Sequence, residues 1–396
     1  MSLQSQTIKR ISKLMAFFFI IEILLCWKLW FPIDREFPMM SAFSWLDFSI
    51  GIPGDGILSL AILISLLFIL IDKYKSLAIV IMVSCLLVTI LEDITRFQPW
   101  VYMQGALLIL LSFNKKGREN AILSGALLIV ALIYMWSGIQ KLNLGFLRDT
   151  FPWLLSTFEF NFQIEPDQPL TSFNYLFALV PLLEFSIGLF LLIPKTRKIG
   201  IIIGLLMHLF IMLSLGPTGH NWNLIVLPWN LCLMLFLIQF YSQKEPIKIT
   251  EGIKSFKLNY IILILFGIMP ALNFIGYWDN TLSGSMYSGT HSDVAFYFDS
   301  DSETDLPKFR KAGTTVVEND DSDYSTSKTW LTYWSVYDIK VPPYPAHRYY
   351  KRFGEKLCEV SKNHLKTGIE ITTRAKFNGT PSVTKCSCLE LLGHDD

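Results

Sequence analysis

Long apolar stretches recur along this chain and constrain its fold more than any other feature. A helix needs about 20 mostly apolar residues to cross roughly 30 Å of hydrocarbon in a bilayer. Nine stretches reach or approach this length: 14–32, 56–72, 76–91, 98–113, 120–140, 173–194, 198–216, 221–241 and 258–278. The pattern predicts a membrane all-α protein, a multi-pass helical bundle of about nine transmembrane helices.

The composition agrees with this class and limits the kinds of partner that we expect. The 396 residues are 52% hydrophobic and only 17% charged, whereas soluble proteins carry about 25% charged residues. The formal net charge is +1, so no basic surplus is available for nucleic acid. We therefore expect the lipid bilayer, and a molecule bound in a pocket, as partners.

The connections between the stretches predict the orientation, because Lys and Arg concentrate in cytoplasmic loops. The first stretch has bulky side chains and no small-residue cleavage site, so it reads as an uncleaved helix. The basic residues near the amino terminus place that end in the cytoplasm. An odd number of crossings then places the C-terminal region on the other side of the membrane. The basic segments at alternate connections are Lys9–Lys13, Asp72–Lys75, Lys115–Arg118, Lys195–Lys198 and Lys244–Lys257.

The composition changes abruptly after Trp278, which predicts two domains: a transmembrane domain over 1–280 and a soluble extracytoplasmic domain over 281–396. The second domain reads as a small α+β or mostly β module. We expect a helix at Ala346–Ser361 and strands at Val294–Phe298, Trp330–Ile339, Ile369–Phe377 and Ser382–Leu391.

Three cysteines lie in this second domain. A disulfide from Cys358 to either Cys386 or Cys388 is compatible with an oxidising compartment. The one-residue gap between Cys386 and Cys388 is typical of neither a zinc site nor a thioredoxin-like site.

Lys141 is the most informative polar residue of the apolar stretches. It stands at the end of the apolar run Ala126–Ile139, where burying an ammonium group in hydrocarbon is costly. One interpretation is a helix end whose charged side chain extends into headgroup water. The other is a buried amine that desolvation keeps unprotonated, so that it acts as a general base.

Two residues share a helix face with Lys141. Tyr134, Ser137 and Lys141 follow one another at helical spacing, so a phenol, a hydroxyl and an amine can line one wall of a pocket. The alternative is structural: Ser137 and Gly138 form a close-packing seam between two helices.

Glu184 falls near the middle of the sixth stretch, where a carboxylate needs a partner such as Lys141 or a histidine. Pro181, three residues earlier, is expected to kink the helix and free a carbonyl, as often happens beside a cavity. We expect Glu184 in a polar interior.

His208 lies within the seventh stretch and His220 lies in a Gly-Pro-Gly turn at its outer end. A hydrogen-bonded structural role is one interpretation of His208, and a place in the pocket is the other. His220 is positioned to reach a pocket mouth on the same side as Lys141. Neither histidine has a second ligand at metal spacing, so no metal site is predicted.

Several of these segments together resemble one known family. The string Tyr134–Asn143, continuing to Phe146, is similar to the Lys-Leu segment of vitamin K-dependent γ-carboxylases and their bacterial relatives with the same transmembrane (HTTM) domain. Further segments follow in that family's order over roughly residues 10–290: Pro181–Leu192, Lys195–Lys198, Met207–Phe210, His220–Leu227, Pro270, Trp278 and Met286–Gly289.

The resemblance implies a function. In that family a lysine deprotonates a reduced vitamin K, oxygen converts the anion into a strong base that ends as an epoxide, and carbon dioxide adds to a peptide glutamate. It implies Lys141 as the catalytic base, a reduced naphthoquinone (vitamin K or menaquinol) as cofactor, lyase activity and a protein or peptide substrate at the outer domain. Tyr134, Ser137, Glu184, His208 and His220 are then the pocket candidates.

Two departures from the family stand out. The chain is much shorter than the animal carboxylases, and residues 98–113 lack the histidine that those enzymes carry on the span before the lysine. Three functions therefore stay open: a quinol-dependent oxygenase, epoxidase or carboxylase; a non-catalytic quinone- or lipid-binding protein that contacts a partner through its outer domain; and a transporter, suggested by Glu184 and Pro181.

Overall fold

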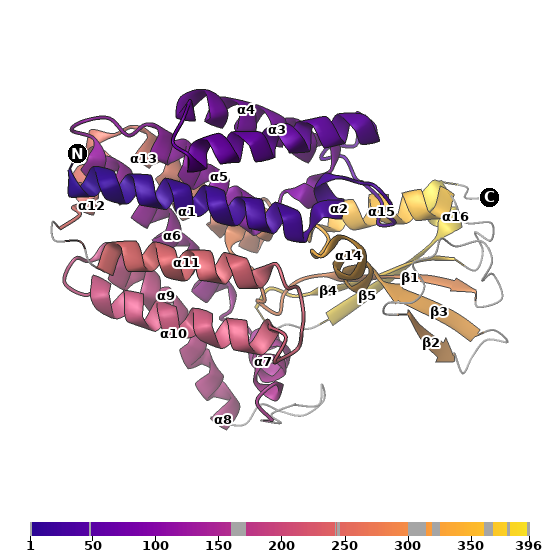
Figure 1. Ribbon diagram of the computed structural model, residues 1–396. Coiled ribbons are helices and arrows are strands. Elements are labelled where there is room, and N and C mark those ends of the chain that lie inside the picture. Colours follow the sequence, from indigo (N-terminus) through magenta and orange to yellow (C-terminus); the bar gives the residue numbers. More distant parts are fainter. Residues whose placement is uncertain are drawn as a thin grey trace.

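The computed structural model describes residues 2–46, 49–159, 172–241, 243, 246–299, 314–318, 325–359, 367–377 and 381–393. The chain is mostly helical and has two parts, a bundle of long helices and a smaller part built on a β-sheet, which lie end to end (Figure 1). The amino terminus and the carboxyl terminus lie at opposite ends of the molecule.

Every predicted apolar stretch contains helix. The bundle is formed by α1 (Leu3–Leu25), α3 (Ile52–Leu70), α4 (Lys75–Glu92), α5 (Pro99–Ser112), α6 (Glu119–Gln140), α9 (Leu179–Leu192), α10 (Arg197–Leu215), α11 (Val226–Tyr241), and α13 (Leu258–Ile262) with its continuations η4 (Leu263–Ile268) and η5 (Met269–Ile275).

Five of these helical segments are long and apolar enough to cross a membrane: α3, α4, α6, α10 and the run Leu258–Ile275. Three more, Pro99–Ser112, Leu176–Leu192 and Val226–Tyr241, are apolar but shorter. Many large apolar side chains point outward from the bundle, including Leu60, Leu67 and Val80 on α3 and α4. This arrangement is consistent with an integral membrane protein, because such surfaces are stable against lipid and not against water.

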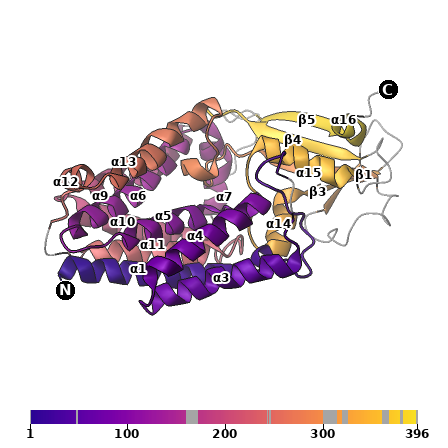
Figure 2. The ribbon, with the colours of Figure 1, turned by 90° about the horizontal axis from the view of Figure 1, so that it is seen from above.

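The basic connections gather at one end of the bundle, far from the sheet. In Figure 2 the amino terminus and α12 (Ile249–Ser255) lie at that end, with the sheet at the other. Side-chain contacts join these connections: Lys9 with Asp72 (2.6 Å), Asn114 with Ser5 (3.5 Å), Asn120 with Lys248 (3.3 Å) and Arg197 with Ile247 (3.3 Å). The clustering of charge that the sequence suggested is thus present in space.

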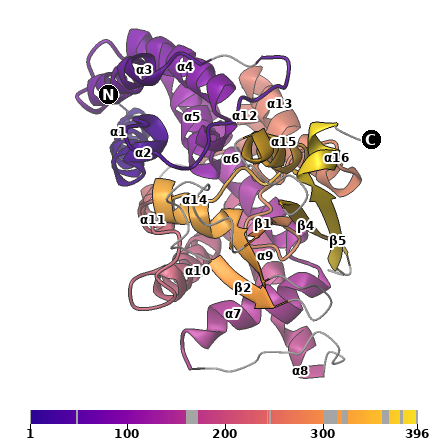
Figure 3. The same ribbon diagram turned by 90° about the vertical axis from the view of Figure 1, so that its right-hand side faces the viewer.

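The second part is a five-stranded antiparallel sheet with the strand order β2-β3-β1-β4-β5. Its central strand, β1 (Asp293–Asp299), buries Val294, Phe296 and Phe298. Figure 3 looks onto the end of the molecule that carries this sheet, with the bundle behind it. The other strands are β2 (Thr314–Glu318), β3 (Ser325–Trp330), β4 (Gly368–Arg374) and β5 (Pro381–Ser387).

One predicted strand is wrong. Residues 331–339, expected as a strand, form the helix α14 (Leu331–Ile339). Its buried residues, Leu331, Trp334, Ser335, Asp338 and Ile339, follow the spacing of one helix face. The aromatic residues of this segment favoured a strand. However, the residues that it buries against the sheet and the bundle recur at helical spacing.

The other predicted elements are confirmed with shifted ends. β1, β4 and the helix α15 (His347–Glu359) match their predicted ranges closely, whereas the strand expected at Ser382–Leu391 ends at Ser387. There the Ser387 side chain and Glu390 form a capping box that starts α16 (Cys388–Leu392). Cys388 forms a disulfide with Cys358, which ties α16 to α15.

Asp338 of α14 connects the two parts. Its carboxylate accepts hydrogen bonds from the backbone N–H groups of Glu36 (2.7 Å) and Phe37 (2.8 Å), and it forms an ion pair with Lys28 (2.8 Å). The Phe37 ring packs against Trp334 and Phe353 of the second part. Lys28, near the end of the first apolar stretch, is therefore bound to the second part of the same chain.

A buried ionic cluster lies at the same end of the bundle. Arg96 forms ion pairs with Asp55 (2.5 Å) and Glu92 (3.3 Å), and Arg35 forms one with Asp93 (2.7 Å). Glu92 and Arg96 are four residues apart, a spacing that allows an ion pair at a helix end. All of these side chains are almost completely buried, which keeps the loop after α2 (Trp27–Trp30) against the bundle.

Candidate functional site

The helix α6 is enclosed by its neighbours, and two glycines explain its contact with α9. A methyl group at Gly138 of α6 would lie 2.5 Å from the Pro181 carbonyl oxygen, and one at Gly188 of α9 would lie 2.3 Å from the Ala131 carbonyl oxygen. Only glycine lets the two backbones approach this closely. The seam suggested by Gly138 is therefore present, and it brings α9 close to the C-terminal turn of α6.

This close packing places Glu184 beside Lys141. The Lys141 amine, at the C-cap of α6, donates to both carboxylate oxygens of Glu184 (3.0 and 2.8 Å) and to the Ser137 hydroxyl (2.5 Å). Lys141 and Glu184 are both buried, so the lysine does not extend into solvent. Three acceptors around Nζ match the three N–H bonds of an ammonium group, so the geometry is that of a charged pair.

A second polar chain runs from the same helix. The Tyr134 hydroxyl is hydrogen-bonded to Nε2 of His208, and Nδ1 of His208 is 2.6 Å from Oδ1 of Asn230. Asn230 donates its amide N–H to the Val226 carbonyl (2.6 Å), which turns Oδ1 toward the histidine. Nδ1 then donates to Asn230, and in the neutral ring Nε2 accepts from the Tyr134 hydroxyl.

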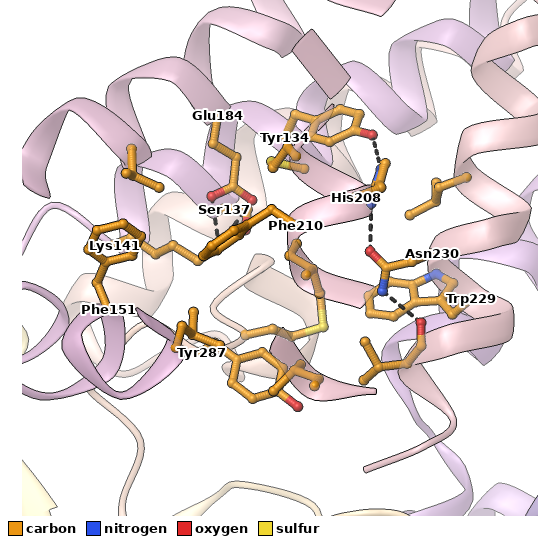
Figure 4. Close-up of a pocket in the computed structure, with 18 of the residues that line it drawn as sticks. Tyr134, Ser137, Lys141, Phe151, Glu184, His208, Phe210, Trp229, Asn230 and Tyr287 are labelled. Atoms are coloured by element: carbon orange, nitrogen blue, oxygen red, sulfur yellow. Dashed lines mark hydrogen bonds and ion pairs between the residues drawn. The ribbon is translucent and has the colours of Figure 1, made fainter. Parts of the chain in front are cut away.

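Both polar groups face one cavity of about 110 Å³ between α6, α9, α10 and α11. Figure 4 shows Lys141 and Glu184 on one side of it, and Tyr134, His208 and Asn230 on another. The remaining lining is almost wholly apolar and includes Phe146, Phe151, Leu154, Val180, Met207, Phe210, Ile211, Leu215, Val226, Trp229, Leu233, Met286 and Tyr287. An apolar pocket with a few fixed polar groups is the usual form of a small-molecule site.

Five of the six residues singled out from the sequence line this cavity: Lys141, Tyr134, Ser137, Glu184 and His208. His220 does not. Its ring stacks on Trp153 at a centroid distance of 4.2 Å, and its Nε2 is 2.7 Å from the Trp153 carbonyl oxygen. This stack holds the loop before α11 in place. The His220 side chain is not part of the cavity wall.

Sequence reasoning missed Asn230 and Tyr287. Asn230 carried the same signal as Glu184, a polar side chain inside an apolar helix. Tyr287 had no such signal, because it lies in a loop that the fold brings under the bundle; its φ of +50° is unusual for an aromatic residue.

Among the described residues, no group of three or more His, Cys, Asp or Glu side chains could hold a metal ion. Comparison with models of protein families, with curated proteins and with solved structures finds no match for this chain.

The arrangement suits transfer of a proton from a lipophilic ligand. A ligand hydroxyl beside the pair could give its proton to the Glu184 carboxylate, while the Lys141 ammonium stabilises the oxyanion that forms. The Tyr134 hydroxyl, which donates to His208, keeps its lone pairs for a second hydrogen bond from a ligand.

Proposed function

We propose that this protein is an integral membrane enzyme that binds a quinol, of the reduced naphthoquinone type, and removes a proton from it with Lys141 and Glu184. The observation that carries the proposal is the buried ion pair facing a mostly apolar cavity. A quinol has an apolar ring and weakly acidic hydroxyl groups, which match these two features. The resemblance to vitamin K-dependent γ-carboxylases supports the same ligand and suggests epoxidation or carboxylation as the reaction that follows.

The hydrogen bonds of Lys141 favour a different role from the free base that the sequence suggested. An ammonium group with three acceptors is not a free base, so we assign proton acceptance to the pair, with Glu184 receiving the proton and Lys141 holding the quinolate. The pair costs less to bury than either charge alone. The pair can therefore be buried in the low-dielectric pocket before the ligand binds. There the Lys141 ammonium would strongly stabilise the negative charge that forms on the quinol oxygen.

We further propose nine membrane crossings, with the amino terminus in the cytoplasm and the sheet-bearing part outside it. The gathering of the basic connections at the end far from the sheet supports this orientation. The cavity lies between α6, α9, α10 and α11. A lipophilic quinol would enter it from the bilayer.

The test uses the full chain in lipid nanodiscs with menaquinol and air. We expect menaquinol consumption, followed by the absorbance of its oxidised product, and its loss in the double variant Lys141→Gln/Glu184→Gln, which removes both charges without leaving either unpaired. The matched control is Lys248→Gln/Glu251→Gln, an exposed pair at 3.0 Å, which should consume menaquinol like the wild type. Undiminished consumption by the first double variant would exclude the proposal.

A second function is favoured by the same geometry: a quinone- or lipid-binding protein without catalysis. All three N–H bonds of Lys141 already have acceptors, so the pair is stable without a reaction. Naphthoquinone binding, measured by quenching of tryptophan fluorescence, together with no menaquinol consumption by the wild type would identify this function instead.

A further inference from the structure

A second cavity, of about 200 Å³, lies where the bundle meets the sheet-bearing part. Its walls come from the start of α5, the loop and first turn of α11, the 280–292 segment and the second part. The lining residues are Gln98, Pro99, Trp100, Trp222, Asn223, Ile225, Val226, Trp229, Asn280, Thr281, Met286, Tyr287, His291, Ser292, Thr332, Pro342, Pro343, Pro345 and Tyr350.

This junction cavity shares a wall with the membrane cavity. Val226, Trp229, Met286 and Tyr287 line both. A molecule in the junction cavity would therefore be separated from a ligand beside Lys141 by one layer of side chains.

The shared wall is held in place by several independent contacts. Asn143 donates to the Ser288 carbonyl (2.8 Å), and a methyl group at Gly289 (φ +74°) would lie 2.4 Å from the Gly145 carbonyl carbon. Tyr287 stacks on Trp153 with ring planes 16° apart. Uncommon backbone conformations that the surroundings maintain in this way are typical of binding sites.

Two buried polar atoms of the cavity lack a hydrogen-bond partner. They are Nδ1 of His291 and Oδ1 of Asn223, while Nδ2 of Asn223 donates to the Tyr287 hydroxyl (3.3 Å). Such groups are uncommon in folded proteins because leaving them unpaired costs about 1–3 kcal/mol each. The Asn223 oxygen accepts hydrogen bonds, and Nδ1 of a neutral His291 ring also accepts one, because the other ring nitrogen donates to the Ser285 backbone. A ligand that offers a hydrogen-bond donor to each atom would satisfy both.

The absence of charged side chains from the described part of the lining indicates the charge of the ligand. No Asp, Glu, Lys or Arg occurs among the described residues that line the cavity. Burial, with the nearby charges of Lys376 and Lys141, lowers the pKa of His291 to about 4, so the ring is neutral at pH 7. The Lys376 ammonium does not line the cavity. It donates hydrogen bonds to the side-chain oxygens of Asn273 (2.9 Å) and Asn280 (2.6 Å).

We propose that the junction cavity is a second ligand site for an uncharged molecule with hydrogen-bond donors, such as a primary amide, held by His291 and Asn223. It would be the site of the second reactant, next to the activated quinol, and only this assignment of its role rests on the proposed function. Binding itself does not require the quinol.

The test compares benzamide with benzoate, which share a shape and differ in charge, on the full chain in nanodiscs by ligand-observed NMR. We expect saturable binding of benzamide and at least about tenfold weaker binding of benzoate. His291→Phe and Asn223→Leu should each weaken benzamide by about fivefold, the loss of one hydrogen bond of about 1 kcal/mol.

Two controls make the result decisive. His347→Phe, at an exposed histidine of α15, should bind benzamide like the wild type, and thermal unfolding identifies any variant that fails to fold. Lys141→Gln/Glu184→Gln should also bind benzamide normally, so a failure of the quinol proposal is separable from a failure of this one. No saturable binding, equal binding of benzoate, or unchanged binding by both site variants would overturn the proposal.

Discussion

At the scale of single residues, Lys141 and Glu184 show how a charge is accommodated within an apolar bundle. Each is the main partner of the other, and Ser137 completes the coordination of the amine. Removing one partner from a buried ion pair leaves an uncompensated charge, whereas removing both does not. Stability should therefore respond very differently to single and double substitutions.

We predict that Lys141→Gln alone lowers the free energy of unfolding by roughly 3–5 kcal/mol, the typical result of orphaning a buried charge. The double variant Lys141→Gln/Glu184→Gln should recover most of this loss. Denaturant titration followed by tryptophan fluorescence measures both. Equal losses for the single and the double variant would show that the pair does not act as a unit.

His291 predicts a dependence of stability on pH. Its pKa, lowered from the ordinary 6.5 to about 4 by burial and by Lys376 and Lys141, means that the unfolded chain binds more protons between these values. Its contribution to stability is complete above pH 6.5 and is lost as the pH falls toward 4.

The measurement is the unfolding midpoint at pH 7 and at pH 4.5. We expect His291→Gln to lose less stability than the wild type between these two pH values, and the exposed-site variant His347→Gln to behave like the wild type. An identical acid response of His291→Gln and the wild type would contradict the assignment.

The sequence predicted part of the cavity because polar side chains inside apolar helices are few. Lys141, Ser137, Tyr134, Glu184 and His208 were found by this rule, and they do line one cavity. Their pairing was not predictable with certainty, since Lys141 and Glu184 are 43 residues apart and meet only through the packing of α6 on α9. Tyr287 could not be predicted as a cavity residue, because a residue in a loop belongs to no periodic pattern.

At the scale of elements, the seam between α6 and α9 makes the clearest prediction. Gly138→Ala should destabilise the chain by about 1–3 kcal/mol, the usual effect of overpacking. It should also displace Glu184, because a methyl group there would lie 2.6 Å from the backbone nitrogen of Phe185. Unfolding and menaquinol consumption should therefore both be impaired.

Gly105 provides the matched control. It lies within α5, and a methyl group there would meet nothing within 4 Å. Gly105→Ala should be neutral or stabilise the chain by roughly 0.5–1 kcal/mol, as expected for alanine in a helix. If both glycine variants behave alike, the close approach of α6 and α9 is not the cause.

Elements were predictable where the hydrophobic pattern was long and regular. All nine apolar stretches contain helix, and α15 was found from its strong amphipathic pattern. The segment that forms α14 was misread because its aromatic residues favour strands locally, while its burial depends on a tertiary partner. The edge strand β2 and its neighbour β3 were not predicted as strands, since short polar strands carry little signal.

At the scale of the whole molecule, the proposed orientation can be measured directly. A cysteine at exposed Lys116, among the basic connections, should react only with a membrane-permeant thiol reagent in intact cells. A cysteine at exposed Lys340, in the sheet-bearing part, should react with an impermeant reagent as well. The unsubstituted chain gives the background of its own thiols, and the opposite pattern would reverse the topology.

The contacts of Asp338 have a practical consequence for dissection of the protein. The sheet-bearing part also rests on the bundle through Tyr349, whose hydroxyl donates to the Ala42 carbonyl (2.7 Å), and through Arg352, which donates to the Ser41 carbonyl (3.0 Å). Cut free near residue 280, this fragment would leave the Asp338 carboxylate without its donors and the ring of Trp334 without Phe37. Studies of its ligands should start from the intact polypeptide.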